Sequence, residues 1–162
     1  MEDIEQLAVR VGRHLRTVRA TLATAESCTG GLVGHWITEV PGSSAYYVGG
    51  VVAYSNQVKE DLLGVRRQTL EIHGAVSRQT AEEMAAGVRR LFGSTYALAV
   101  TGIAGPTGGT AQKPVGLTFV AVAAPETIFV RRFVWAGDRH QNKHSSARAA
   151  LELLWEYLKT NP

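Results

Sequence analysis

The chain has 162 residues, of which 45% are hydrophobic and 19% charged, a composition typical of one folded domain and not of a disordered chain. The formal charge of +3 is spread along the sequence and forms no basic stripe of the kind that binds nucleic acid. One cysteine excludes an intrachain disulfide and a cysteine-rich metal site, and no apolar run is long enough to span a membrane. We therefore expect a cytoplasmic protein with a single domain over 1–162 and neither nucleic-acid nor membrane partners.

The first part of the chain alternates between helical and strand-like patterns. Apolar residues recur at helical spacing over 4–18, and a strand-like run follows at 21–25. A second helical face covers 32–40, where a Pro-Gly pair ends it. Residues 49–54 have the pattern of a strand, and residues 56–63 that of a short helix.

The rest of the chain adds three strands and two helices. Ser77 is predicted to cap a helix that reaches Leu91, and 96–101 has the continuous apolar pattern of a buried strand. Two β-rich segments at 115–123 and 127–135 form a predicted hairpin, and a final helix covers about 138–159. This order predicts an α/β fold: a three-layer α/β/α sandwich with a mixed, mostly parallel sheet and one antiparallel strand.

Three polar segments each follow a predicted strand of this sheet. Ser27 follows the first strand, Tyr54 and Lys59 follow the second, and a glycine-rich loop at 102–109 follows the third. In open α/β sheets, ligands bind at the carboxyl ends of the strands. We therefore expect these three segments to meet at one cleft.

The first of these segments, residues 25–31, has the sequence Ala-Glu-Ser-Cys-Thr-Gly-Gly and precedes a predicted helix. Free backbone N–H groups at such a position favour an anion or a developing oxyanion. Ser27 is a candidate nucleophile that Lys59 or Tyr54 would activate, and Cys28 is an alternative nucleophile. The structural alternative is a simple helix cap, in which Ser27 or Thr29 accepts a backbone hydrogen bond.

Together these motifs resemble the CinA C-terminal domain family, whose characterised activity is nicotinamide mononucleotide amidohydrolase. The resemblance covers residues 5–158 and is closest to the stand-alone form, since the additional N-terminal domain of longer CinA proteins is not in this sequence. It is carried by seven motifs: residues 25–31, Tyr54-Ser55-Asn56 with Lys59, His73-Gly74-Ala75-Val76-Ser77, Thr101-Gly102-Ile103-Ala104-Gly105-Pro106, Gly108-Gly109, Lys113-Pro114-Val115-Gly116 and Gly137-Asp138-Arg139.

The resemblance implies that the protein hydrolyses the carboxamide of nicotinamide mononucleotide, a C–N bond in a linear amide, to nicotinic acid mononucleotide and ammonia. It implies a Ser27 nucleophile with Tyr54 and Lys59 as its activating pair, and no cofactor. It also makes a homo-oligomer the expected assembly, with a small-molecule nucleotide as the partner. A non-catalytic nucleotide-binding or regulatory module with the same fold remains the alternative function.

The chemistry assigns roles to further residues. Amide hydrolysis needs an oxyanion site, which the N–H groups of Thr29, Gly30 and Gly31 would supply if they are free. Lys59 can accept a proton only if its pKa, ordinarily about 10.4, is lowered by burial or by a nearby cation.

The substrate's phosphate needs a separate binding site. The loop that contains Gly102 and Gly105 could provide backbone N–H groups, and Arg139 could provide a positively charged group that binds two phosphate oxygens. The structural alternative for the loop is a tight turn with no role in binding. Thr101 is a candidate contact to the carboxamide or the ribose.

No metal site is predicted. His140 and His144 stand four residues apart on the last predicted helix, a spacing that could present two metal ligands on one face. No acidic partner accompanies them, and an exposed helical face explains both.

Overall fold

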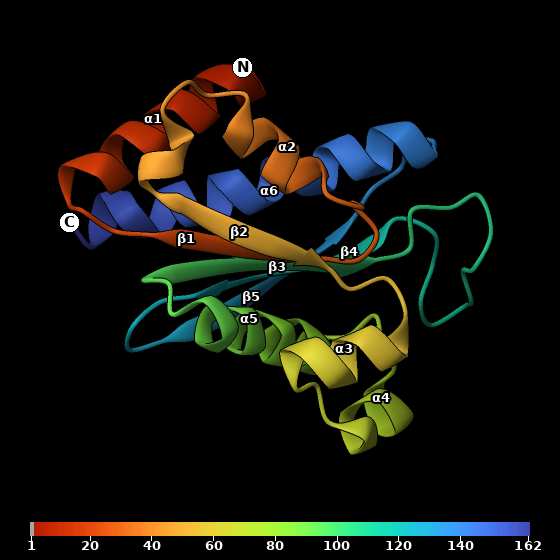
Figure 1. The fold of residues 1–162 in the computed structure, drawn as a ribbon. Helices are drawn as coiled ribbons and strands as arrows, with labels where there is room; N and C mark the ends of the chain where they lie inside the picture. The colour runs from red at the N-terminus through yellow and green to blue at the C-terminus, as the bar shows by residue number, and fades with distance from the viewer. Residues whose placement is uncertain (1) are drawn as a thin grey trace.

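A computed structural model describes residues 2–162 and shows a five-stranded sheet between two layers of helices (Figure 1). The elements are α1 (Ile4–Thr17), β1 (Leu22–Glu26), α2 (Leu32–Thr38), a short 3₁₀ helix η1 (Ser43–Ala45), β2 (Tyr47–Val52), α3 (Asn56–Leu63), α4 (Arg67–His73), α5 (Arg78–Phe92), β3 (Tyr96–Gly102), β4 (Leu117–Ala123), β5 (Ile128–Val134) and α6 (Arg139–Thr160).

The strand order is β2-β1-β3-β4-β5. β1 lies between β2 and β3 and is parallel to both, whereas β4 is antiparallel to β3 and to β5. β4 is therefore the one strand that runs against the others, as the predicted mixed sheet required. The carboxyl ends of β1, β2 and β3 share one edge of the sheet, and the polar segments that follow these strands begin there.

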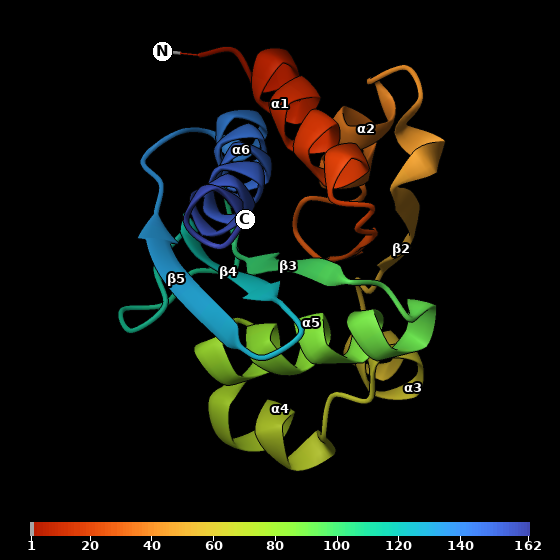
Figure 2. The ribbon, with the colours of Figure 1, turned by 90° about the vertical axis from the view of Figure 1, so that its left-hand side faces the viewer.

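Helices cover both faces of the sheet and confirm the three-layer sandwich. α1, α2 and α6 pack on one face, and α3, α4 and α5 lie on the other (Figure 2). Leucines of α1 and α6 dominate the first apolar core, while alanines of the strands form much of the second, against α5. Small side chains let the helices come close: a Cβ added at Gly87 of α5 would lie 1.8 Å from the carbonyl oxygen of Leu63 in α3. This contact fixes the end of the helix that carries Lys59.

Local sequence signals explain several element boundaries. The Ser77 side chain accepts a hydrogen bond from Thr80 N and caps α5 as predicted, and Ser55 caps α3 in the same way. Asp138 and Gln141 form a reciprocal capping box at the start of α6. Helix α4 was not predicted from the sequence, because Thr69 is the one buried residue of this short helix and so little of it faces the core. No helix within residues 2–162 combines the length and the apolar character that crossing a membrane requires.

Candidate active site

The site is built around a buried contact between Ser27 and Lys59. Ser27 is the first residue after β1, and Lys59 lies in α3, which follows β2. Lys59 Nζ lies 3.1 Å from Ser27 Oγ, and the lysine is only 1% exposed. The same nitrogen donates to the carbonyl oxygens of Ala53 and Tyr54, at 2.8 and 3.1 Å. Two segments separated by more than thirty residues thus place an amine against a serine hydroxyl.

This environment favours the neutral form of the lysine. Burial lowers the pKa of Lys59, and the small opposing effect comes from the Cys28 thiol and not from a carboxylate. A neutral amine has two hydrogens and one lone pair. The two hydrogens match the carbonyl oxygens of Ala53 and Tyr54, which leaves the lone pair to accept the proton of Ser27. Neutral Lys59 can therefore act as a base toward this hydroxyl.

The structure argues against Cys28 as the nucleophile. The pKa of the Cys28 thiol is raised to about 12, mainly by burial, and the neighbouring Glu26 carboxylate contributes in the same direction. The thiolate is the reactive form, so this thiol is unreactive near neutral pH. The sulfur also packs against β3, since a Cβ added at Gly102 would lie 3.1 Å from Cys28 Sγ. Cys28 is a packing residue of the site.

The backbone of the turn after Ser27 is only partly free. The N–H of Gly30 donates to the Ser27 carbonyl oxygen at 3.1 Å, so it is not available to an oxyanion. Glu26 accepts hydrogen bonds from the N–H groups of Val33 and Gly34, at 2.8 and 3.0 Å, and thereby caps α2. Within residues 2–162, the N–H groups of Cys28, Thr29 and Gly31 have no protein acceptor. The amide groups of Cys28 and Thr29 are the free donors nearest to Ser27 in the chain.

A cavity of about 330 Å³ opens beside Ser27 and Lys59. Its other lining residues are Cys28, Tyr54, Ala75, Val76, Thr101, Gly102, Ile103, Ala104, Gly105, Thr107, Gly108 and Arg139. The three segments that follow β1, β2 and β3 therefore meet at one cleft. The predicted residues Thr29, Gly30 and Gly31 are not among the lining residues and face a second cavity instead.

The glycine-rich loop and Arg139 form one side of this cleft. Arg139 Nη1 donates to the carbonyl oxygen of Gly105 at 2.7 Å and holds the loop against the start of α6. In the part of the chain that the structure describes, the N–H groups of Ala104, Gly105, Thr107 and Gly108 have no protein acceptor. A cation and free amide groups are thus gathered on the same loop, an arrangement suited to an anion.

Tyr54 lies at the mouth of the cleft. Its side chain is 64% exposed, and its hydroxyl makes one long contact of 3.5 Å, to Arg139 Nη2. Across residues 2–162 the hydroxyl has no hydrogen bond to Ser27 or Lys59, so the structure brings Lys59, and not the Tyr54 hydroxyl, to the serine.

The loop before α5 contributes residues to which the sequence assigned no role. Ala75 and Val76 line the cleft, and the Thr101 hydroxyl donates to the Ala75 carbonyl oxygen at 2.7 Å. Thr101 is therefore engaged in holding this loop. The motif His73-Gly74-Ala75-Val76-Ser77 was the only feature of the sequence that drew attention to this loop. Ala75 and Val76 have no reactive side-chain group, so their residue types did not indicate that they line the cleft.

The fold and the cleft define an α/β/α sandwich with a buried serine–lysine pair at the carboxyl edge of its parallel strands. The family described as CinA C-terminal domain matches residues 4–158. The chain belongs to this family.

Relatives and solved structures agree with this assignment. The chain is 50% identical over 161 residues to a CinA-like protein of Geotalea daltonii and 46% identical over 158 residues to one of Thermotoga maritima, covering 99% and 98% of this chain. It spans only 39% and 38% of those two proteins. The competence/damage-inducible protein CihA of Agrobacterium tumefaciens superposes with a TM-score of 0.94 at 43% identity, covering 98% of this chain and 97% of the other. Competence damage-inducible protein A of Klebsiella pneumoniae gives a TM-score of 0.96 at 35% identity, covering 99% and 100%.

Proposed function

We propose that this protein is a serine amidohydrolase that converts nicotinamide mononucleotide to nicotinic acid mononucleotide and ammonia. The observation that carries the proposal is the 3.1 Å contact between Ser27 Oγ and a buried Lys59 amine with a lowered pKa. Membership of the CinA C-terminal domain family, which is associated with this activity, supports the choice of substrate. The cleft volume of about 330 Å³ suits a small molecule of this kind.

The proposed reaction begins with proton transfer from Ser27 Oγ to neutral Lys59. The serine oxygen attacks the carboxamide carbon, and the oxyanion of the tetrahedral intermediate accepts a hydrogen bond from the free amide group of Cys28, which lines the cleft. Protonated Lys59 then gives its proton to the leaving nitrogen, so ammonia departs and an acyl-serine remains. Lys59 then takes a proton from water, the hydroxide attacks the ester and releases the carboxylic acid product, and Lys59 returns the proton to the departing Ser27 Oγ.

Arg139 and the glycine-rich loop are the proposed phosphate site. Arg139 already approaches the loop through Gly105, and the N–H groups of Thr107 and Gly108 remain unpaired within residues 2–162. The phosphate would then lie at the mouth of the cleft, near Tyr54, with the carboxamide directed toward Ser27. Because the phosphate takes no part in the chemistry, this contact contributes equally to the ground and transition states.

Release of ammonia by the purified protein tests the activity directly. We expect ammonia and nicotinic acid mononucleotide in equal amounts, with the same rate in the presence of a metal chelator. Tight binding of the mononucleotide without turnover would instead identify a non-catalytic nucleotide-binding module. Loss of turnover on chelation would contradict the serine mechanism.

Replacing Arg139 by alanine is expected to raise KM for nicotinamide mononucleotide by about tenfold and to change kcat little. A hydrogen bond to a charged group contributes about 1.5 kcal/mol to the binding free energy when the group is exposed, the lower end of the usual range. This value corresponds to about tenfold in affinity. Steady-state kinetics would measure both constants. Nicotinamide riboside, which lacks the phosphate, is the control: the variant and the parent protein should handle it equally. An equal loss with both substrates would reject the phosphate assignment.

The hydrolysis rate is expected to rise with pH through the lowered pKa of Lys59. The protonated amine cannot accept the Ser27 proton, so kcat/KM should be low below that pKa and level off above it. The midpoint should lie below the ordinary lysine value of about 10.4. The measurement is kcat/KM at a series of pH values, with circular dichroism at each pH to confirm that the protein stays folded. A profile without this rise would exclude Lys59 as the base.

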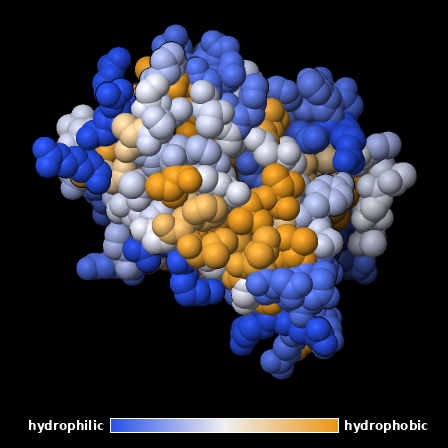
Figure 3. Space-filling model, in the orientation of Figure 1, coloured by the Kyte–Doolittle hydropathy of each residue, from blue (hydrophilic) through white to orange (hydrophobic). Residues whose placement is uncertain are grey.

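We also propose that the protein forms a homo-oligomer through the open edge of β2. Figure 3 shows an apolar area over β2 and toward α3, and Val48 and Val52 of this edge strand are 44% and 51% exposed. An edge strand offers unpaired backbone groups to a second chain. Light scattering coupled to size exclusion should give a multiple of the chain mass, and Val48→Lys with Val52→Lys should shift it to the monomer. A monomeric parent protein would contradict the proposal.

A further inference from the structure

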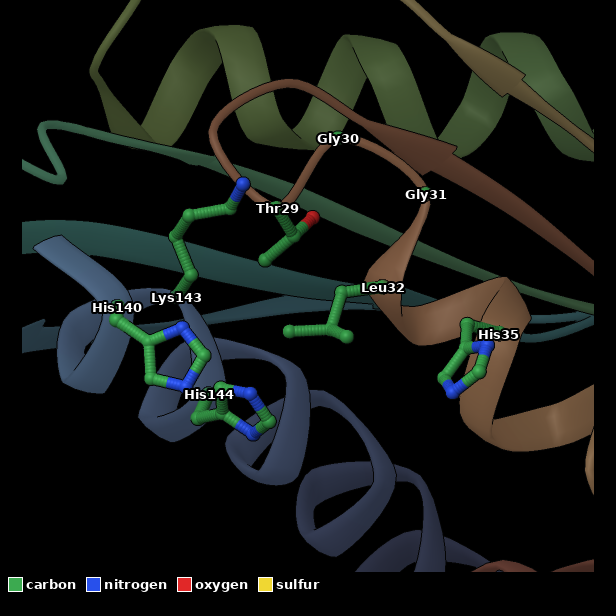
Figure 4. Close-up of a pocket in the computed structure, with 8 residues that line it drawn as sticks. All are labelled: Thr29, Gly30, Gly31, Leu32, His35, His140, Lys143 and His144. Atoms are coloured by element: carbon green, nitrogen blue, oxygen red, sulfur yellow. The ribbon is translucent and has the colours of Figure 1, made fainter.

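A second cavity, of about 420 Å³, lies next to the turn that follows Ser27. It is lined by Thr29, Gly30, Gly31, Leu32 and His35 from the turn and α2, and by His140, Lys143 and His144 from α6. Figure 4 shows Lys143 extending from α6 toward the turn, the rings of His140 and His144 next to each other on the same helix, and His35 on α2. We call it the histidine cavity. It shares no lining residue with the cleft that contains Ser27.

The histidine cavity gathers basic groups without a counter-charge. The rings of His140 and His144 lie 4.5 Å apart, and a Cβ added at Gly30 would lie 3.8 Å from Lys143 Nζ. No carboxylate lines the cavity, and Lys143 belongs to none of the ion pairs within residues 2–162. The nearby Glu26 carboxylate is already bound to two N–H groups of α2.

The effect of these charges on one another is visible at His144. Burial lowers the pKa of His144, and the positive charges of His140, Lys143 and His35 lower it further. These three residues come from both elements that form the cavity. Groups of like charge are therefore held together here with nothing in the described chain to neutralise them, and a bound anion would relieve their repulsion.

A second, independent observation points to a missing hydrogen-bond acceptor beside the cavity. The Thr29 side chain is 1% exposed, and its hydroxyl has no hydrogen-bond partner in the described residues. Buried hydroxyl groups are almost always paired in folded proteins. A small rotation of this side chain toward the cavity would give its O–H an acceptor if an oxygen-rich anion were bound there.

We propose that the histidine cavity binds the phosphoryl group of a small phosphorylated molecule, at a site separate from the Ser27 cleft. A phosphoryl group offers several acceptor oxygens and a charge of up to about −2, which suits three imidazoles, an ammonium group and a hydroxyl. The volume of about 420 Å³ leaves room for more than the phosphoryl group alone. Binding at this site does not require turnover, so the proposal stands or fails independently of the amidohydrolase activity.

Calorimetric titration with inorganic phosphate and with adenosine monophosphate tests the proposal. The parent protein should bind both, and the double variant His140→Gln with Lys143→Gln should bind each at least about tenfold more weakly, equivalent to about 1.4 kcal/mol. Lys159→Gln, an exposed lysine in the last turn of the same helix, is the matched control and should bind normally. Thermal unfolding would confirm that each variant is folded.

The two ligands identify the source of the phosphoryl group. Tighter binding of adenosine monophosphate indicates a phosphorylated metabolite with a larger organic part, whereas equal affinities indicate the free anion. Either result supports the site if it depends on His140 and Lys143. Absence of binding to the parent protein, or equal affinities in the parent and the double variant, would overturn the proposal.

Two further measurements separate this site from the Ser27 cleft. Sulfate, whose charge is constant between about pH 5.5 and about pH 8, should bind several-fold more tightly at the lower pH, because a larger fraction of the histidines is charged there. Affinity that does not change over this range would contradict a histidine site. Adenosine monophosphate should also bind to Arg139→Ala as it binds to the parent protein. Loss of binding in that variant, or strict competition with nicotinamide mononucleotide, would place the ligand in the Ser27 cleft instead.

Discussion

Replacing Ser27 by alanine is expected to abolish amide hydrolysis, whereas replacing Cys28 by alanine should leave most of it. A nucleophile and its base act together, so removing the nucleophile alone lowers kcat by about 10⁴-fold or more. Ser27 Oγ lies 3.1 Å from the Lys59 amine, while the neighbouring thiol is buried with a pKa raised to about 12. The measurement is ammonia release by the two variants at a saturating substrate concentration.

The Cys28 variant is the matched control for this experiment because it alters the adjacent residue in the same cleft. It should lose some stability, since a buried sulfur is removed from between the turn and β3. Thiol alkylation should not label the native protein readily, for the same reason. Substantial turnover by Ser27→Ala, or its loss in a folded Cys28→Ala protein, would replace the serine mechanism with a cysteine one.

Replacing Lys59 by methionine is expected to lower kcat by about 10³-fold or more while leaving the affinity for the mononucleotide largely unchanged. Methionine keeps an unbranched apolar side chain, slightly shorter than that of lysine, but has no amine, so the proton transfers that Lys59 performs are lost. Single-turnover rates and equilibrium binding of the substrate would separate the two effects. Lys159→Met, at the far end of α6, is the control for removal of a lysine charge.

The Lys59 substitution also leaves the carbonyl oxygens of Ala53 and Tyr54 without their donor. Unpaired buried carbonyl groups are costly, so a modest fall in melting temperature is expected. The folded fraction must therefore be measured alongside activity. A folded variant with unchanged kcat would exclude Lys59 from proton transfer, whereas weaker substrate binding with unchanged kcat would make it a binding residue.

The layered fold was predictable because its signals are local and repeated. Apolar residues at helical spacing placed α1, α5 and α6, and buried runs placed β1 and β3, each within a few residues of their observed ends. β2 begins at Tyr47, two residues earlier than its glycine-rich core suggested, because backbone pairing with Leu22 extends it. Helix α4 left no signal, since most of its side chains face solvent.

The site was predictable to the level of loops but not of individual groups. The rule that parallel strands present their carboxyl ends at one edge brought Ser27, Lys59 and the glycine-rich loop together. Whether a backbone N–H is free for a ligand depends on tertiary contacts that the spacing of residues in the sequence does not reveal. The hydrogen bonds that Glu26 accepts from two N–H groups of α2 are an example. For the same reason Thr29, Gly30 and Gly31, placed beside Ser27 by sequence, line a different cavity, and His140 and His144 line it with them.

Helix α6 has a practical consequence for experiments on immobilised or labelled protein. The helix begins with Arg139 at the mouth of the cleft and continues for 22 residues to Thr160. With a rise of 1.5 Å per residue, its two ends lie roughly 33 Å apart, and Figure 1 shows the C-terminus at the opposite end of the sheet from the glycine-rich loop. A fluorophore or surface tether attached after Thr160 would therefore leave substrate access unobstructed, so turnover on a sensor chip should match turnover in solution.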